Sequence, residues 1–462
     1  MECVAMREVI HKLICDKKVV ILGFGREGRA TLPWILEDRS VAKLAIADLN
    51  PVKLPSDMDK EVAEGIELIT GEDYQKCLDE YDVVFKSPGV VLEQEKSYYD
   101  CKIVSEMDVF FEAYRDRIVG ITGTKGKSTT TTLMYHVLKN AGRKVLLAGN
   151  IGIPVFDIAK DIEEDTLLVV ELSCHQLEYA TVSPHIGVLL NIHEEHLDHY
   201  GTMDKYVAAK ENIYKNQVKG DILLCEQKLK PEVVESQVIT VSALGMTGDM
   251  SADVYVDDNI INKNYNDKEI YEIKTSEISL LGLHNYYDIA YVYTIGRILG
   301  LCKEELEEGF KTYEPLPHRL QNIGIVEDVT YYDDSISTID ETTIQALNTL
   351  KDADSVIIGG MDRGISYDSL IKYLSEASIP HIILMEETGR RIYKEIEEMP
   401  EFKERDRLVL VDHLEDAVRM AKKITAKGKA CVMSPAAASY GIFKNFEERG
   451  QVFKQLVYGD VS

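Results

Sequence analysis

Short apolar runs alternate with longer polar stretches through the first part of the chain. Val19-Val20-Ile21-Leu22 is followed by glycines and a helix-length segment, and apolar runs return at Leu44–Ala47 and Val83–Phe85. Strands of a parallel sheet are covered on both faces, so they form continuous apolar runs. The alternation therefore predicts βαβ units around a parallel sheet.

The same pattern restarts twice further along the chain. The strand Ile118–Ile121 precedes a predicted helix through Thr130–Lys139, and a third α/β pattern begins near Leu316. Further strands are predicted at Lys144–Leu147, Thr166–Val170, Gly187–Leu190, Val329–Tyr332, Ser355–Ile358, His381–Leu384, Leu408–Val411 and Ala430–Met433.

Residues 221–283 break the alternation with short pieces such as Val254–Val256 and Ile270–Ile273, which predict a small β-rich appendage. We therefore predict an α/β protein of three domains. These are an N-terminal Rossmann-like domain (1–116), a central P-loop ATPase-like domain with the appendage (117–314), and a C-terminal Rossmann-like domain (315–462).

Composition narrows the class of protein. A length of 462 residues suits about three domains of about 150 residues each. The 79 acidic and 52 basic residues give a net charge of −27, which disfavours nucleic acid as a partner. No apolar run reaches the roughly 18–20 residues that span a bilayer. Eight scattered cysteines without a CxxC pair, and an N-terminus unlike a signal peptide, favour a cytoplasmic protein. We expect a monomer that binds no membrane.

The strongest local signal is a glycine- and lysine-rich turn between a strand and a helix. It reads Gly123-Thr124-Lys125-Gly126-Lys127-Ser128-Thr129. Backbone N–H groups in such a turn, with the helix N-terminus, attract phosphate. Lys127 suits the β- and γ-phosphates and Ser128 suits Mg²⁺. The spacing departs from GxxxxGK[ST], because Ile121 stands where a glycine is expected. We still predict a nucleotide site.

Acidic and histidine residues follow two of the predicted strands. Glu171 closes one strand, where α/β proteins place ligand sites, and the segment Asn191–His199 follows another. A zinc site is an alternative for this segment, but His193-Glu194-Glu195-His196 lacks the HExxH spacing. Its acidic composition favours Mg²⁺.

A second glycine loop lies near the N-terminus. Gly23-Phe24-Gly25-Arg26-Glu27-Gly28 follows the first strand, and Asp48 ends the next one. The spacing fits a dinucleotide site with Asp48 on a ribose hydroxyl. A single loop of this kind serves NAD, UDP or tight packing, so all three stay open on spacing alone.

Taken in order, these segments resemble the Mur ligases, the ATP-dependent amino-acid ligases of peptidoglycan precursor synthesis. The resemblance spans nearly the whole chain. Its further motifs are Gly149-Asn150-Ile151-Gly152, Glu171-Leu172-Ser173, Asn191–Asp198, Ala208-Ala209-Lys210, His284-Asn285, Leu316-Pro317-His318-Arg319, Asp334-Ser335 and Gly359-Gly360. Three segments resemble the branch that adds glutamate to UDP-N-acetylmuramoyl-L-alanine, namely Glu171–Glu178, Ser434–Ser439 and Phe443–Gly450.

The resemblance implies roles at the nucleotide end. Catalysis would involve Lys127, Lys210, His196 and Arg319, and two Mg²⁺ ions would be held by Ser128, Glu171, His196 and a carbamylated Lys210. ATP would be bound by Gly123, Thr124, Lys125, Gly126, Lys127, Ser128, Thr129, Asn150, Asn285, Arg319 and Asp334. His196 is also a candidate base for the incoming amine. Arg319 and Asp334 would come from the third domain, so the resemblance implies domain closure.

The resemblance also implies substrate contacts and favours UDP over NAD at the first loop. The UDP-linked substrate would be bound by Gly25, Arg26, Glu27, Gly28, Asp48, Ser87, Gly89, Ser173 and Gln176. The incoming amino acid would be bound by Thr338, Ser439 and Phe446.

One departure concerns the amino acid. Ile336 stands where this branch usually carries a lysine that pairs with the glutamate carboxylate. We expect D-glutamate, with L-glutamate or another amino acid as the alternative. Three rivals are a nicotinamide-dependent dehydrogenase, a non-catalytic nucleotide-binding relative, and a folylpolyglutamate synthetase-like ligase. The dehydrogenase leaves Lys127, Glu171 and His196 without a role.

Overall fold

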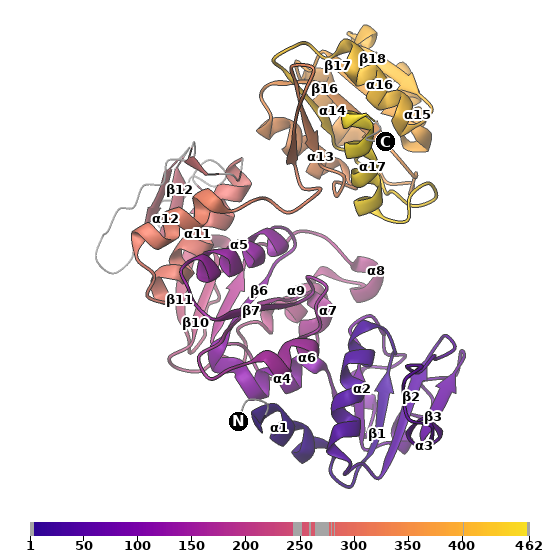
Figure 1. Ribbon diagram of the computed structural model, residues 1–462, viewed down its shortest axis with the longest axis vertical. Coiled ribbons are helices and arrows are strands. Elements are labelled where there is room, and N and C mark those ends of the chain that lie inside the picture. The colour runs from indigo at the N-terminus through magenta and orange to yellow at the C-terminus, as the bar shows by residue number, and fades with distance from the viewer. Residues whose placement is uncertain are drawn as a thin grey trace. The chain divides into compact units, whose positions relative to one another are not determined.

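The computed structural model describes residues 4–243, 252–257, 260–263, 277, 278, 280, 282–400 and 402–459. The chain divides into two compact units (Figure 1). The first comprises Met1–Ile278 with Leu283–Tyr313, and the second comprises Ser279–Gly282 with Glu314–Ser462.

The first unit begins with a five-stranded parallel sheet of order β3-β2-β1-β4-β5. Strands β1 and β4 are buried along nearly their whole length, as continuous apolar runs require. The strands are β1 Lys18–Leu22, β2 Lys43–Asp48, β3 Ile66–Thr70, β4 Val83–Lys86 and β5 Lys102–Val104. The helices are α1 Val4–Ile14, α2 Arg26–Asp38, α3 Lys60–Glu64 and α4 Glu106–Tyr114.

A second sheet of the same unit has eight strands in the order β13-β12-β11-β10-β9-β6-β8-β7. All neighbours are parallel except β12 and β13. The strands are β6 Ile118–Thr122, β7 Val145–Gly149, β8 Leu167–Glu171, β9 Ile186–Leu189, β10 Ile222–Glu226, β11 Gln237–Ala243, β12 Val254–Asp257 and β13 Ile260–Lys263.

This order corrects one expectation. The β-rich segment predicted as an appendage extends the central sheet, because β10 pairs with β9 and β11 and β12 continue the ladder. The short strands β10–β13, which gave the alternating pattern, form one end of the eight-stranded sheet. The strand predicted at Ile270–Ile273 lies outside the described residues.

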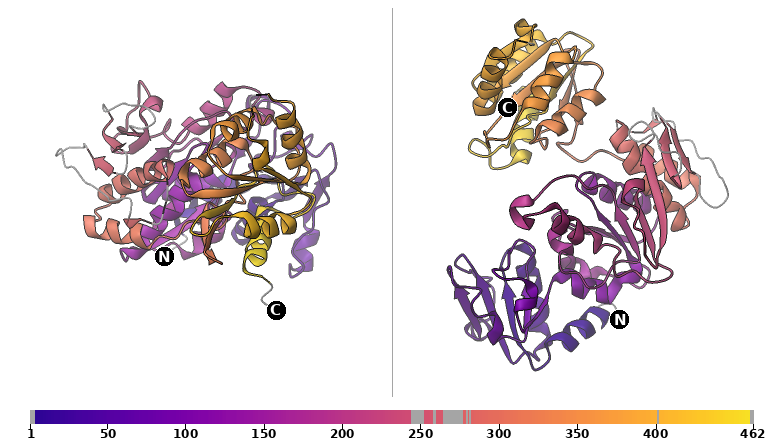
Figure 2. Two further views of the ribbon diagram at one scale, coloured as in Figure 1. Left: turned by 90° about the horizontal axis from the view of Figure 1, so that it is seen from above. Right: turned by 180° about the vertical axis from the view of Figure 1, so that it is seen from behind.

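Helices α5 Lys127–Asn140 and α11 Leu283–Ile298 pack against each other and against this sheet (Figures 1 and 2). Gly126, at the start of α5, approaches α11 so closely that a Cβ there would lie 2.6 Å from Asp288 Oδ1. The other helices are α6 Val155–Ile158, α7 Cys174–Leu177, α8 Leu197–Tyr200, α9 Met203–Glu211 and α12 Lys303–Thr312.

The second unit contains a six-stranded sheet of order β14-β15-β19-β16-β17-β18, antiparallel only between β14 and β15. Two apolar cores, one with α13, α14 and α15 and one with α16 and α17, enclose it (Figure 2). Strands are β14 Gln321–Val326, β15 Val329–Asp333, β16 Ala353–Gly359, β17 His381–Met385, β18 Leu408–Val411 and β19 Ala430–Met433. Helices are α13 Asp340–Thr349, α14 Asp368–Glu376, α15 Glu386–Glu397, α16 Leu414–Ile424 and α17 Phe446–Tyr458.

The strands predicted within the described residues are confirmed, with ends that differ by at most two positions. Outside the β-rich segment 221–283, three strands of the described residues were not predicted: β3, β5 and β14. Strand β3 buries only Ile66 fully, and β5 has three residues, so neither forms a long apolar run. Among the described residues, no helix is both long and apolar enough to cross a membrane.

Candidate active site

The loop between β6 and α5 contains the predicted glycine and lysine residues and leads directly into the N-terminus of α5. Gly123 and Gly126 have φ values of +159° and +84°, which bend the backbone between the strand and the helix. Gly126 caps α5 without a side-chain hydrogen bond. The first N–H groups of a helix lack intrahelical partners, so this end of α5 suits an anion. The predicted position of the loop is confirmed.

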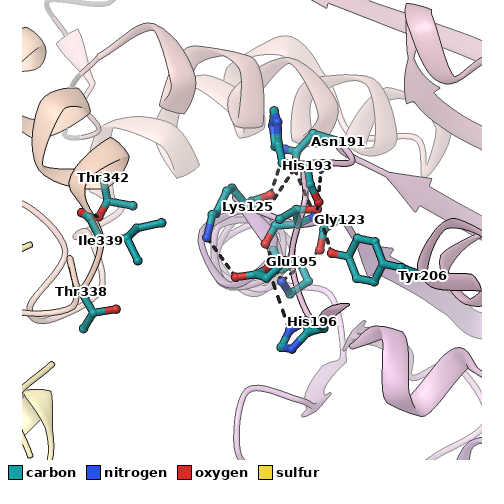
Figure 3. A network of polar contacts seen from close by, with 12 residues as sticks. Gly123, Lys125, Asn191, His193, Glu195, His196, Tyr206, Thr338, Ile339 and Thr342 are labelled. Atoms are coloured by element: carbon teal, nitrogen blue, oxygen red, sulfur yellow. Dashed lines mark hydrogen bonds and ion pairs between the residues drawn. The ribbon is translucent and has the colours of Figure 1, made fainter. Parts of the chain in front are cut away.

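Asn191, just beyond β9, holds this loop in shape (Figure 3). Its side-chain oxygen accepts hydrogen bonds from the N–H groups of Thr124 at 3.1 Å and Lys125 at 2.8 Å. Its amide nitrogen donates to the carbonyl of Lys125 at 3.0 Å. The hydroxyl of Thr124 contacts the hydroxyl of Tyr206 at 2.9 Å and accepts from the N–H of His193 at 2.9 Å. The hydrogen bonds of the Asn191 side chain to the loop backbone therefore hold the loop in this conformation.

Two lysine side chains converge on one carbonyl of the loop. Lys127 Nζ donates to the carbonyls of Gly123 at 3.0 Å and Thr124 at 2.9 Å. Lys210 Nζ, from α9, donates to the same Gly123 oxygen at 2.8 Å. Lys210 is 1% exposed, and burial together with the charge of Lys127 lowers the pKa of Lys210 to about 7. Burial also lowers the pKa of Lys127.

Glu171 provides a buried carboxylate near these lysines. It ends β8 and is 1% exposed. Its Oε1 accepts a hydrogen bond from Asn150 at 2.8 Å, whereas Oε2 is buried and has no hydrogen-bond partner among the described residues. An unpaired buried carboxylate oxygen is costly, and a divalent cation would satisfy it. The donor set at this point therefore fits Mg²⁺.

His196 lies with a different group of side chains. Its imidazole contacts the ring of His175, with 5.0 Å between ring centroids. Ligand atoms of Cys174, His175 and His196 all lie within 4.8 Å of one another. Burial and the neighbouring imidazoles lower the pKa of His175 to about 4. The side chain of Lys125 forms an ion pair with Glu195 at 3.1 Å (Figure 3).

The N-terminal glycine loop is held by two of its predicted ligand-binding residues. Asp48 Oδ2 accepts a hydrogen bond from the N–H of Phe24 at 2.7 Å, and the hydroxyl of Ser87 donates to the carbonyl of Gly23 at 2.7 Å. A Cβ at Gly28 would lie 2.2 Å from the oxygen of Gly23, so the loop requires glycine there. Gly25 and Gly89 are exposed. The end of the first sheet therefore presents an open, rigid loop.

A polar contact joins this loop to the segment after β8. Gln176 donates a hydrogen bond to Glu27 Oε1 at 2.8 Å, and Ser173 forms a capping box with Gln176 at the start of α7. Burial raises the pKa of Glu27, and the bond to Gln176 opposes that rise. Arg26 reaches the same region, because a Cβ at Gly152 would lie 3.2 Å from its Nη1. Four residues predicted to contact the UDP-linked substrate are thus brought together.

In the second unit, the predicted residues gather where β15 and β19 end. Asp334 is 5% exposed, and it accepts hydrogen bonds from the Leu320 N–H at 3.0 Å and the Ser434 hydroxyl at 2.7 Å. Burial raises the pKa of Asp334 to about 6. Arg449, fully buried, donates to Ser335 and to the carbonyl of Ala437 at 3.0 Å.

The remaining predicted residues occupy nearby segments of their own units. The backbone carbonyl of Thr338 accepts a hydrogen bond from the guanidinium of Arg363 at 2.6 Å, and Ser439 is buried. Phe446 begins α17, and its carbonyl accepts from the Ser335 hydroxyl at 2.8 Å. Arg319 is half-buried, and Asn285 lies in the first turn of α11 in the first unit.

Sequence reasoning missed several residues that shape the site. Asn191 was predicted only as part of an acidic metal segment, but it braces the phosphate loop. Arg449 and Tyr206 are buried polar partners that no spacing rule identifies. Asp288, on α11, is a further residue for which no role in the site was predicted from the sequence. Its close approach to Gly126 depends on the packing of α11 against α5.

Comparison with known proteins places these features in a family. A family model described as the Mur ligase middle domain matches residues 121–295. Two curated relatives named UDP-N-acetylmuramoylalanine--D-glutamate ligase match almost end to end. The one from Clostridium kluyveri is 32% identical and covers 96% of both chains, and the one from Acetivibrio thermocellus is 31% identical and covers 96% of this chain and 97% of its own.

The fold agrees with solved structures. The crystal structure of MurF ligase from Thermotoga maritima, in complex with ADP, superposes with a TM-score of 0.56 at 18% identity, and it covers 97% of this chain and 96% of that one. The glycine loop, the order of the motifs and the full-length match lead to one conclusion: the chain belongs to the Mur ligase family.

Proposed function

We propose that this chain is an ATP-dependent ligase that adds D-glutamate to UDP-N-acetylmuramoyl-L-alanine. The observation that carries this assignment is the convergence of Lys127 and Lys210 on the Gly123 carbonyl of the phosphate loop, with the carboxylate of Glu171 at the end of the neighbouring strand β8. The full-length similarity to relatives named for this reaction supports the choice of substrates. We further propose that it acts as a monomer in the cytoplasm.

The reaction requires activation because a carboxylate is a poor electrophile. A carboxylate oxygen of UDP-N-acetylmuramoyl-L-alanine attacks the γ-phosphorus of ATP, and ADP leaves. The glutamate amine then attacks the acyl carbon of the acyl phosphate, and inorganic phosphate leaves the tetrahedral intermediate after the amine has lost a proton. Lys127, beside the N-terminus of α5, stabilises the negative charge on the transferring phosphoryl group.

Magnesium is the cation that this site fits. Ser128, Glu171, His196 and a carbamylated Lys210 would hold two ions. Bound Mg²⁺ neutralises phosphate charge. The buried, unpartnered Oε2 of Glu171 supports this choice, because Mg²⁺ prefers hard oxygen ligands.

Lys210 is suited to carbamylation. A pKa of about 7 leaves a large fraction of the amine neutral at neutral pH, and only the neutral amine attacks CO₂. The reaction forms an N–C bond and releases a proton, which converts a cation beside Lys127 into an anion. Repulsion between two buried ammonium groups would thereby become attraction.

The other predicted residues would bind the substrates. Arg26, Glu27, Ser87 and Gln176, with Gly25, Gly28, Asp48, Gly89 and Ser173, would bind the UDP-linked substrate. Asn150 and Asn285 would contact adenine, Asp334 the ribose and Arg319 the γ-phosphate. Thr338, Ser439 and Phe446 would bind glutamate. These assignments follow the family resemblance, and the hydrogen bonds of Glu27, Asp48 and Asp334 support them by holding those side chains in place.

A second candidate is the addition of L-glutamate. Ile336 is half-buried and cannot pair with a carboxylate, so the residue usually expected to select the glutamate side chain is missing. Phosphate release should be measured with Mg²⁺, ATP, UDP-N-acetylmuramoyl-L-alanine and either enantiomer. Release with D-glutamate alone supports the first candidate, and release with L-glutamate alone supports the second. Absence of phosphate release with both enantiomers would refute both candidates.

A further inference from the structure

Three donor atoms of kinds that bind zinc meet beside the phosphate loop. Cys174 and His175 open α7 directly after β8, and His196 comes from the loop after β9. One ligand atom from each lies within 4.8 Å of the other two. The thiol of Cys174 is buried, at 2% residue exposure, whereas His196 is exposed. The group is therefore anchored on one side and reachable from solvent on the other.

The distances between the three donor atoms are close to those between the ligands of a tetrahedral metal ion. Bonds of about 2.1 Å to nitrogen and about 2.3 Å to sulfur separate tetrahedral donors by roughly 3.5 Å. Side-chain rotation that closes each gap by about an ångström would bring all three donors onto one ion. Three protein ligands leave a fourth position for water or a substrate oxygen.

The surrounding residues orient the imidazoles as a second coordination shell would. His175 Nδ1 lies 3.3 Å from the hydroxyl of Tyr200, and the two rings are stacked at an interplanar angle of 5°. This contact holds the ring of His175 through Nδ1. His199 lies next to it, with ring centroids 4.3 Å apart, and its Nε2 is 3.4 Å from Glu178 Oε2. Such partners fix the orientation of ligating histidines.

The donor chemistry discriminates between metals. A thiolate and two imidazoles suit Zn²⁺ or Co²⁺, whereas Mg²⁺ prefers oxygen ligands. Mg²⁺ is therefore expected at the carboxylate of Glu171. Zn²⁺ is expected at the group formed by Cys174, His175 and His196. His196 belongs to both sets if it also serves Mg²⁺ as proposed above.

We infer that Cys174, His175 and His196 form a binding site for Zn²⁺, and that zinc bound there withdraws His196 from the Mg²⁺ site and inhibits the ligase. The inhibitory part rests on the proposed function, whereas the binding part does not.

Binding is tested with Co²⁺, which reports its ligands by absorption. The full-length reduced protein, without nucleotide, is titrated with Co²⁺ and then with Zn²⁺. We expect an equimolar complex with a thiolate-to-cobalt charge-transfer band, which Zn²⁺ abolishes. Cys174→Ser should remove that band, and His175→Phe should weaken Co²⁺ binding by at least about tenfold. Cys302→Ser, which changes an exposed cysteine before α12, should keep the band.

Circular dichroism and thermal unfolding of each variant establish that it is folded. If Cys174→Ser does not fold, the folded His175→Phe variant still reports the site, because its Co²⁺ affinity is compared with that of the wild type. Absence of the charge-transfer band in the wild type, or its persistence in folded Cys174→Ser, would overturn the assignment.

Inhibition is measured separately as phosphate release at fixed Mg²⁺ with increasing Zn²⁺. We expect inhibition that a chelator reverses, and a zinc concentration for half inhibition at least about tenfold higher in His175→Phe, relative to its own zinc-free rate. Equal sensitivity of wild type and variant would refute the regulatory role. A protein inactive without zinc would refute the ligase assignment, and the cobalt titration would still decide the metal site.

Discussion

Lys127 and Lys210 donate hydrogen bonds to the same carbonyl oxygen, yet they are expected to act differently. Lys127 begins the helix whose N-terminus faces the phosphate site, so its charge should act on the phosphoryl group. Lys210 is more deeply buried, and its pKa of about 7 suits a reactive amine. Burial lowers the pKa of both lysines, and at Lys210 the charge of Lys127 lowers it further.

Lys127→Ala should lower kcat/KM for ATP by about 10³-fold or more, because a charged group that contacts the transferring phosphoryl is lost. Steady-state phosphate release measures the effect. Lys139→Ala, at the exposed far end of the same helix, is the matched control and should stay within about twofold of wild type. Comparable rates for the two variants would contradict the role given to Lys127.

Carbamylation of Lys210 should depend on pH in a defined direction. Its folded pKa of about 7 lies below the ordinary value of about 10.4, so the neutral amine predominates above pH 7 and declines below it. Carbon-13 NMR with labelled bicarbonate should show a carbamate signal that is strong above pH 7 and weak below it. Lys210→Ala should lack the signal, and a small carboxylic acid should partly restore its ligase activity. A signal that persists in Lys210→Ala would place the carbamate elsewhere.

At the scale of elements, the phosphate loop depends on β9 and α11 as well as on β6 and α5. Asn191 follows β9 and bonds the loop backbone, while α11 approaches Gly126. The loop itself could be predicted, because a strand, glycines and a helix follow one another in sequence. Its braces could not, since they come from segments far away in the chain that only the sheet order and helix packing bring near.

Asn191→Ala should lower the free energy of unfolding by about 1–3 kcal/mol, because the Lys125 N–H loses its acceptor and the Thr124 N–H keeps only the backbone carbonyl of Asn191. It should also weaken ATP binding. Chemical denaturation and nucleotide titration measure the two effects. Asn140→Ala, at the exposed end of α5, should change neither. An unaltered nucleotide affinity in Asn191→Ala would show that the loop keeps its shape without this brace.

Gly126→Ala and Gly142→Ala separate backbone strain from close packing. Both glycines have positive φ, +84° and +72°, so both substitutions carry a similar strain of about 1–2 kcal/mol. Only at Gly126 would the new Cβ lie 2.6 Å from Asp288, whereas Gly142 has open space. Thermal unfolding should therefore show a larger loss for Gly126→Ala. Equal losses of thermal stability in the two variants would mean that α11 shifts to make room for the methyl group.

At the scale of the whole molecule, each of the two units carries part of the predicted chemistry. The phosphate loop, Lys210 and Glu171 belong to the first unit, and Arg319 and Asp334 belong to the second. The α/β class and nearly all buried strands were predictable, because buried parallel strands form apolar runs. The continuity of β10–β13 with the central sheet was not, since strand pairing over long separations leaves no local pattern. The grouping of His196 with Cys174 and His175 was hidden for the same reason.

The central claim is that the chain passes a phosphoryl group from ATP to a substrate carboxylate. The most direct measurement uses UDP-N-acetylmuramoyl-L-alanine labelled with oxygen-18 in its carboxylate, together with ATP, Mg²⁺ and glutamate. Attack by that carboxylate on the γ-phosphorus predicts that one labelled oxygen appears in the inorganic phosphate. Amide formation with unlabelled phosphate would contradict the account.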